Sequence, residues 1–183
     1  MSGVIAMVAP LIVFVALGWV ALLVTAPFLP AAPAALTYVL GSQICHQISE
    51  RSFHADGVQL PVCARCLGIY AGFAGGAMFG TLRRFVRGAD SVPLRHRGQR
   101  PVRGESTLAR AQAVVAVGAV PTVVTLLAEW VGLWEPSNLT RALAGGPFGA
   151  AAGLVVIAVL ATVHYDECAP RPPISHDRPP SHI

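Results

Sequence analysis

Four long apolar runs, separated by shorter polar stretches, divide the chain. They cover about residues 4–29, 64–82, 111–131 and 142–163. A membrane-spanning helix needs about 20 mostly apolar residues, so each run is long enough to cross a bilayer, the second only just. The pattern predicts an all-α integral membrane protein. We expect a bundle of four transmembrane helices with a Cys/His-rich loop before the second helix.

The polar stretches define the rest of the organisation. Residues 1–166 form one predicted domain, and the proline-rich tail 167–183 is predicted to be disordered. Residues 83–110 form a basic loop between the second and third spans. Pro30 and Pro33 end the first run, and a short helix is predicted between that point and the cysteine-rich loop.

The composition agrees with a membrane protein. Charged residues make up 12% of the chain, against about 25% in soluble domains, and 54% of residues are hydrophobic. The first apolar run has no basic residue before it and is long for a secretory signal, which favours a retained span. The lipid bilayer is therefore an expected partner, and no nucleic-acid motif accompanies the basic charge.

The arginines predict the orientation. All 13 basic residues are arginine, eight of them in the 83–110 loop and two in the tail. The other three are Arg51, Arg65 and Arg141. Because short cytoplasmic loops carry an excess of basic residues, we expect a multi-pass protein of the inner (cytoplasmic) membrane with both termini in the cytoplasm. The cysteine-rich loop would then face outward.

Glycines recur every four residues in the second and fourth runs. The two sets are Gly68, Gly72, Gly76 and Gly80, and Gly145, Gly149 and Gly153. At this spacing each set lines one helix face, and small residues let two helix backbones approach closely within a membrane. We expect the second and fourth spans to cross in contact. The alternative use is a homodimer through one glycine face.

Three cysteines and two histidines lie in the loop before the second span. Cys63 and Cys66 form a C-x-x-C pair, whose spacing suits two thiolates on one metal ion. With Cys45 and His46 they make a sulfur and nitrogen set typical of zinc. His54 is an alternative fourth ligand. Because adjacent residues point to different sides of regular structure, Cys45 and His46 reach one ion only from an irregular backbone.

Two other interpretations of the cysteines stay open. C-x-x-C is also a thiol–disulfide exchange motif, with Cys45 as a shuttle partner for the pair. Arg65, between Cys63 and Cys66, favours thiolates in both cases. The other interpretation is an inert disulfide with a spare cysteine. We rank the metal site first, a membrane thiol oxidoreductase second and the disulfide third. A small transporter or an assembly subunit is a further alternative, without a specified substrate.

Further polar residues map to the same outward end as the cysteines. Glu129, at the end of the third span, is predicted to pair with Arg51, Arg65 or Arg141, because ionisable groups at such depth are usually paired. Ser137 and Asn138 are typical of a helix N-cap before the fourth span. Site-lining roles are expected for Gln47, Arg51, His54, Arg65, Tyr70, Glu129, Ser137, Asn138 and Arg141.

Three stretches resemble an uncharacterised prokaryotic membrane family, domain of unknown function 2085. They are CHQISERSF, PVCARCLGIYAG and EPSNLTRALAGG. The resemblance is close over about residues 40–82 and loose over 110–160. The matching positions are Cys45, His46, Gln47, Arg51, Ser52, Phe53, Cys63, Arg65, Cys66, Gly68, Tyr70, Gly72, Ser137, Asn138, Arg141 and Gly145. His54 lies outside them, which favours His46 as the fourth ligand. The resemblance implies one membrane domain with one special site, and no activity.

Overall fold

The computed structural model describes residues 2–90 and 105–168, which are mostly helical. The long helices are α1 (Ser2–Thr25), α3 (Ala64–Asp90), α4 (Glu105–Trp130) and α5 (Asn138–Cys168). Between α1 and α3 lie the short elements η1 (Ala26–Phe28), α2 (Ala31–Ser42), η2 (Ser49–Arg51), β1 (Ser52–Ala55) and β2 (Val58–Cys63). The candidate site combines these short elements and the turn after α2 with the ends of α3, α4 and α5.

Three of the described helices contain a segment long and apolar enough to cross a membrane. These segments are Met7–Phe28, Leu108–Trp130 and Asn138–Leu160. They agree with the first, third and fourth predicted spans. The 27-residue helix α3 is long enough, but it is not among them, because its glycines and arginines reduce its hydropathy. By the length and composition of these three segments, the chain is a multi-pass membrane protein. The span at 64–82 stays a prediction.

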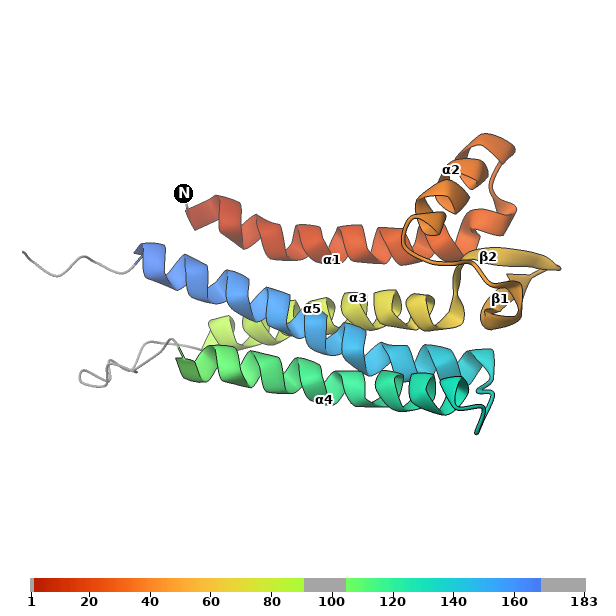
Figure 1. The fold of residues 1–183 in the computed structure, drawn as a ribbon. Helices are drawn as coiled ribbons and strands as arrows, with labels where there is room; N and C mark the ends of the chain where they lie inside the picture. The colour runs from red at the N-terminus through yellow and green to blue at the C-terminus, as the bar shows by residue number, and fades with distance from the viewer. Residues whose placement is uncertain (1, 91–104, 169–183) are drawn as a thin grey trace, which may run out of the picture.

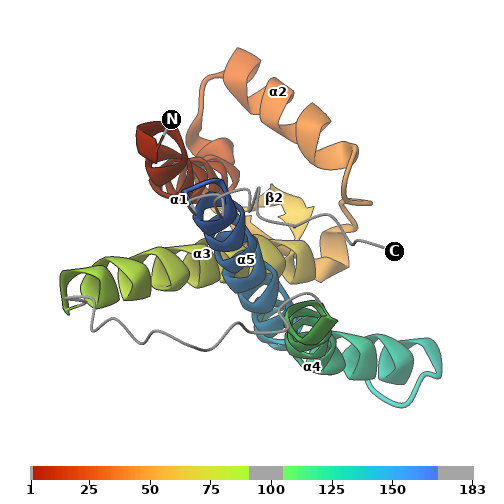
Figure 2. The same cartoon turned by 90° about the vertical axis from the view of Figure 1, so that its left-hand side faces the viewer.

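The four long helices run side by side along the length of the molecule (Figure 1). The short helix α2, the β1–β2 hairpin and the α4–α5 connection gather at one end, which we call the hairpin end. The N-terminus of α1 lies at the opposite end. Seen along the bundle, α5 is central, with α1, α3 and α4 around it (Figure 2). Its most extensive contact is with α3, as the glycine pattern predicted.

The glycines explain how closely α3 and α5 approach. A Cβ atom added to Gly68 would overlap the backbone of Ala142, and Gly72 and Gly76 meet the α5 backbone in the same way. From the other side, three α5 glycines meet the α3 backbone: Gly145, Gly149 and Gly153. The fourth α3 glycine, Gly80, lies against the side chain of Ile157. Both glycine faces are thus covered within one chain. The homodimer through one glycine face stays a prediction, and neither face is left open for a second copy of the chain.

The cysteine-rich loop contains a β-hairpin that the sequence pattern did not suggest to us. Strands β1 and β2 are antiparallel, with His54 opposite Gln59 and Ala55 opposite Val58. At the turn, Asp56 has φ 48° and Gly57 has φ 80°. Two positive φ angles in a two-residue Asp-Gly loop are the usual geometry of a tight hairpin. The Asp-Gly pair was therefore the signal for this element.

The other differences concern where helices begin and end. Helix α3 continues to Asp90 and α4 begins at Glu105, so both ends of the expected 83–110 loop are helical. Helix α5 continues to Cys168, beyond the predicted span. The short helix expected after Pro33 is present as α2. The rest of the basic loop and the tail, residues 91–104 and 169–183, lie outside the described residues.

Candidate metal centre

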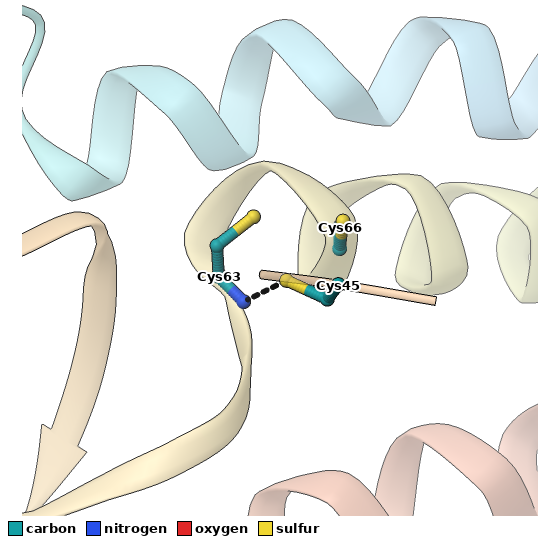
Figure 3. A group of neighbouring side chains, drawn as sticks. All are labelled: Cys45, Cys63 and Cys66. Atoms are coloured by element: carbon teal, nitrogen blue, oxygen red, sulfur yellow. Dashed lines mark hydrogen bonds between the residues drawn. The ribbon is translucent and has the colours of Figure 1, made fainter. Parts of the chain in front are cut away.

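Three separate elements bring the cysteines together. Cys45 follows α2, where its N–H donates to the Gly41 carbonyl at 2.9 Å. Cys63 ends β2 and Cys66 lies in the first turn of α3. The three Sγ atoms all lie within 4.8 Å of one another, and Figure 3 shows the sulfurs gathered at the start of α3. The site thus requires the hairpin to lie against α3.

An irregular turn after Cys45 holds this arrangement. Gln47 has φ 51°, in the left-handed region, and its Nε2 donates to the carbonyls of Tyr38 at 2.8 Å and Pro61 at 2.7 Å. Gln59 Nε2 in turn donates to the Gln47 carbonyl at 2.6 Å. Gln47 therefore ties the loop to both α2 and β2. Its backbone provides the irregular geometry that two neighbouring ligands, Cys45 and His46, would need.

The site favours thiolate at Cys63. The pKa of Cys63 is lowered to about 5, mainly by its hydrogen bond with the Cys66 thiol. Burial opposes this shift, whereas hydrogen bonds from the N–H groups of Cys66 and Arg65 and from the Cys45 thiol add to it. The Cys63 N–H also donates to Cys45 Sγ at 3.1 Å. Deprotonated sulfur is the form that binds metal and attacks disulfides.

The cysteine group rests on an apolar base. Buried Cys45 packs with Leu23 and Val62, and the partly buried rings of Trp19 and Tyr70 border the same cluster. These two rings meet edge to face, with centroids 6.3 Å apart.

Cys45, Cys63 and Cys66 are all free thiols. The inert-disulfide interpretation therefore has no bond to support it among the described residues.

The structure does not bring either histidine into the three-sulfur group. His46 is exposed, but it lines a cavity of about 180 Å³ together with the three cysteines. His54 lies on β1 with its Nε2 3.2 Å from Ser49 Oγ. Of the two, His46 is the one beside the sulfurs. Its role as fourth ligand stays a prediction.

Beside the thiols, three arginines surround one carboxylate. Glu129 Oε1 accepts a hydrogen bond from Arg141 Nη2 at 2.9 Å, and Oε2 accepts one from Arg65 Nη2 at 3.1 Å. Arg51 forms an ion pair with the same carboxylate, with its Nε 3.2 Å from Oε1. The Glu129 side chain is only 4% exposed. The predicted ion pair is confirmed, and all three candidate partners take part in it. We call these four residues the arginine cluster.

Helix α5 links this cluster to the hairpin. The Asn138 side chain donates to the Ser52 carbonyl at 2.9 Å and accepts from Arg141 Nη1 at 3.1 Å. Ser137 Oγ accepts the Thr140 N–H at 3.2 Å, which confirms the predicted N-cap. Ser52 is fully buried, and although it is part of the resemblance, the sequence did not predict a site role for it. The hydrogen bond from Asn138 shows that Ser52 anchors the hairpin to α5.

Comparisons with known proteins agree with these features. The family described as predicted membrane protein (DUF2085) matches residues 45–155, a range that holds both the cysteine group and the arginine cluster. An uncharacterised protein of Methanocaldococcus jannaschii is 28% identical over 108 residues. That match covers 59% of this chain and 58% of the relative, so the chain spans little more than half of the relative's length. No solved structure matches the chain.

Proposed function

The chain belongs to the DUF2085 family of predicted membrane proteins, and we propose that it binds one zinc-type metal ion at the hairpin end of a four-span bundle. Cys45, Cys63 and Cys66 are the proposed sulfur ligands and His46 the fourth. The observation that carries this proposal is the mutual distance of the three Sγ atoms, all within 4.8 Å. Sulfurs bound to one tetrahedral zinc lie at such separations, since each Zn–S bond is about 2.3 Å.

The chemistry of the ligands supports a structural or metal-handling role. Three thiolates and one imidazole close a tetrahedral shell and leave no open position for hydrolysis of a substrate. A bound ion would join the α2 loop, the end of β2 and the start of α3. Metal binding would therefore contribute to the folding free energy of this end of the molecule.

The span at 64–82 and the orientation belong to the same proposal. Helix α3 packs along α5 and also contacts α1, both of which contain candidate spans. A helix so placed shares their depth in the bilayer. With four spans, the arginine-rich 83–110 loop and both termini lie in the cytoplasm of a cell bounded by this inner membrane, and the metal site faces outward.

Metal analysis with thiol titration tests the site directly. The full chain, purified in a mild detergent, should hold about one zinc per chain and release reactive thiols after chelation. Cys63→Ser should lose the metal. Cys168→Ser, the same change at the fourth cysteine, is the matched control and should keep it. A wild-type protein that binds no metal when zinc is supplied would contradict the proposal.

The second candidate is a membrane thiol oxidoreductase. It is favoured by an apolar cavity of about 400 Å³ between α1 and α3, whose lining includes Trp19 and Tyr70 beside the thiols. In this reaction Cys63 and Cys66 form a disulfide, and their two electrons and two protons reduce a quinone to a quinol. A metal-free protein whose C-x-x-C pair cycles with added quinone would establish this alternative in place of the metal site.

Orientation has its own test. A cysteine introduced at Ser91, in the 83–110 loop, should react with a membrane-impermeant maleimide only after the cells are opened. The Ser91→Cys change is best made together with Cys168→Ser, because the second change removes a thiol that would compete for the label. Rapid labelling of this position in intact cells would reverse the topology and place the cysteine group in the cytoplasm.

A further inference from the structure

The cavity beside the thiols has an unbalanced charge. Its volume is about 180 Å³, and its lining includes Arg51, Arg65 and Arg141 but no carboxylate. Glu129, which pairs with these arginines, is not part of this lining and lines the neighbouring larger cavity instead. One carboxylate against three guanidinium groups leaves two surplus positive charges. Both Arg65 and Arg141 are largely buried, with side chains 13% and 10% exposed.

Hydrogen-bonding capacity is also left over. A guanidinium group carries five N–H donors. The described bonds use one nitrogen of Arg65, toward Glu129, and two of Arg141, toward Glu129 and Asn138. The Nε atoms of Arg65 and Arg141 are buried and have no hydrogen-bond partner. Buried charges and donors are costly without partners, so the cluster has capacity for an additional acceptor.

A bound metal would not cancel this surplus. Three thiolates and one divalent ion together carry one negative charge, which leaves the arginine cluster with one positive charge in excess. The surplus comes from the three arginines and their single carboxylate, whether or not a metal is bound. An anionic group therefore suits the cavity in both cases, and the inference does not depend on the proposed metal.

We propose that this cavity is a binding site for a phosphate group, held by Arg51, Arg65 and Arg141. The three arginines come from η2, α3 and α5, so they approach from separate directions. A phosphate has oxygens enough for several guanidinium forks, whereas a carboxylate offers two oxygens and one charge. The volume is below the usual range for drug-sized ligands, about 300–1,000 Å³, and suits a small anionic group.

A second cavity provides space for the remainder of a larger ligand. Its volume is about 580 Å³, and it shares Arg51 and Arg141 with the small cavity. Glu50 and Glu135 line only this larger cavity, so the phosphate belongs in the smaller one. Glu129 is the penultimate residue of the candidate span Leu108–Trp130, which places the cluster near the depth of lipid headgroups. A lipid headgroup and free phosphate are the two sources of the same chemistry.

Two probes distinguish these sources in calorimetric titrations of the full chain in a neutral, phosphate-free detergent. One probe is inorganic phosphate and the other is dihexanoyl phosphatidylglycerol, with dihexanoylglycerol as the lipid without a phosphate. We expect at least one phosphate-bearing probe to bind and dihexanoylglycerol not to bind. Tighter binding of the lipid assigns a headgroup, and equal or tighter binding of phosphate assigns the free ion.

Arg51→Gln is the decisive variant, because Arg51 is 43% exposed and its loss leaves Glu129 two other partners. It should weaken binding at least tenfold. Arg83→Gln, the same change at an exposed arginine far along α3, should leave binding unchanged. If Arg51→Gln does not fold, Arg51→Lys keeps the charge but not the fork and should weaken binding several-fold at an unchanged melting temperature. Cys63→Ser should still bind, which separates this site from the metal.

The proposal is overturned if neither phosphate-bearing probe binds the wild-type protein. It is also overturned if the arginine variants bind as tightly as the wild type, or if dihexanoylglycerol binds as tightly as the tighter of the two phosphate-bearing probes. Loss of zinc without loss of phosphate binding would contradict only the metal site.

Discussion

Helix α3 is used in two different ways along its length. Its middle lies against α5 through glycines, with backbone meeting backbone and no charged group between them. Its first turn carries Arg65 and Cys66, which meet charged and sulfur groups from three other segments. The middle is determined by shape, whereas the first turn depends on partners that are distant in sequence.

This difference has energetic consequences. A close backbone contact tolerates no added atom, because neither helix can move aside without losing the whole interface. The charged end instead depends on complete sets of partners, and loss of one partner leaves a buried group unsatisfied. We therefore expect substitutions in the middle to affect folding most, and those at the hairpin end to affect binding.

The largest expected effect is at the glycine contact. Gly72→Leu places a side chain into the backbone of Gly146 and should destabilise the bundle by more than about 3 kcal/mol, the upper range for overpacking. Gly75→Leu is the matched control, since nothing lies within 4 Å of a Cβ at that position. Thermal unfolding in detergent measures both. Equal melting temperatures for the two variants would contradict the shape argument.

Removal of the central carboxylate should come next. Glu129→Gln leaves three guanidinium groups facing one another without a negative partner, which should cost about 3 kcal/mol of stability. Glu135→Gln, at an exposed position, should change the melting temperature little. A stable Glu129→Gln protein would mean that the cluster is held together by something other than its charges.

The fourth metal ligand is a smaller and sharper test. His46→Ala should weaken zinc binding at least tenfold, because the closed shell loses a ligand. His54→Ala should not, since the Nε2 atom of His54 lies 3.2 Å from the Oγ atom of Ser49 in η2. A competition assay with a zinc-sensitive dye gives both affinities. The reverse order would assign His54, and equal affinities would mean that three sulfurs bind the ion without either imidazole.

The last prediction concerns the reactivity of one thiol in the metal-free protein and leaves stability and binding unchanged. Cys63, with its pKa lowered to about 5, should be almost wholly thiolate at pH 6.5. An ordinary cysteine with a pKa of about 8.5 is about 1% thiolate at that pH. The rate of iodoacetamide labelling at Cys63 should thus rise with pH only up to about 6, as read by peptide mass spectrometry. A rate still increasing above pH 8 would show an ordinary thiol.

Much of the fold was predictable from local pattern. Run length identified the three spans that the structure supports, and glycine spacing identified the α3–α5 contact. The hairpin was not predicted although Asp56 and Gly57 signal it, because the cysteines and histidines of this stretch favoured a loop of metal ligands. The end of α3 at Asp90 was missed because arginines suggested a loop where the helix continues.

The candidate site was predictable only as a set of residues. The sequence placed Glu129 near three arginines without deciding which would pair, and the structure pairs all three. It placed Cys45, Cys63 and Cys66 near one another without the Gln47 turn that orients them. The anchoring role of Ser52 had no local signal, because its partner Asn138 lies 86 residues away.

By itself, the sequence determined the apolar runs, the glycine faces and the collection of reactive residues at one end. These follow from composition and helical period, which are local properties. Only the tertiary structure decided that three thiols converge on one point and that three guanidinium groups share a single carboxylate. Such convergence depends on the positions of α2, η2, the hairpin, α3, α4 and α5 relative to one another, and no local period encodes it.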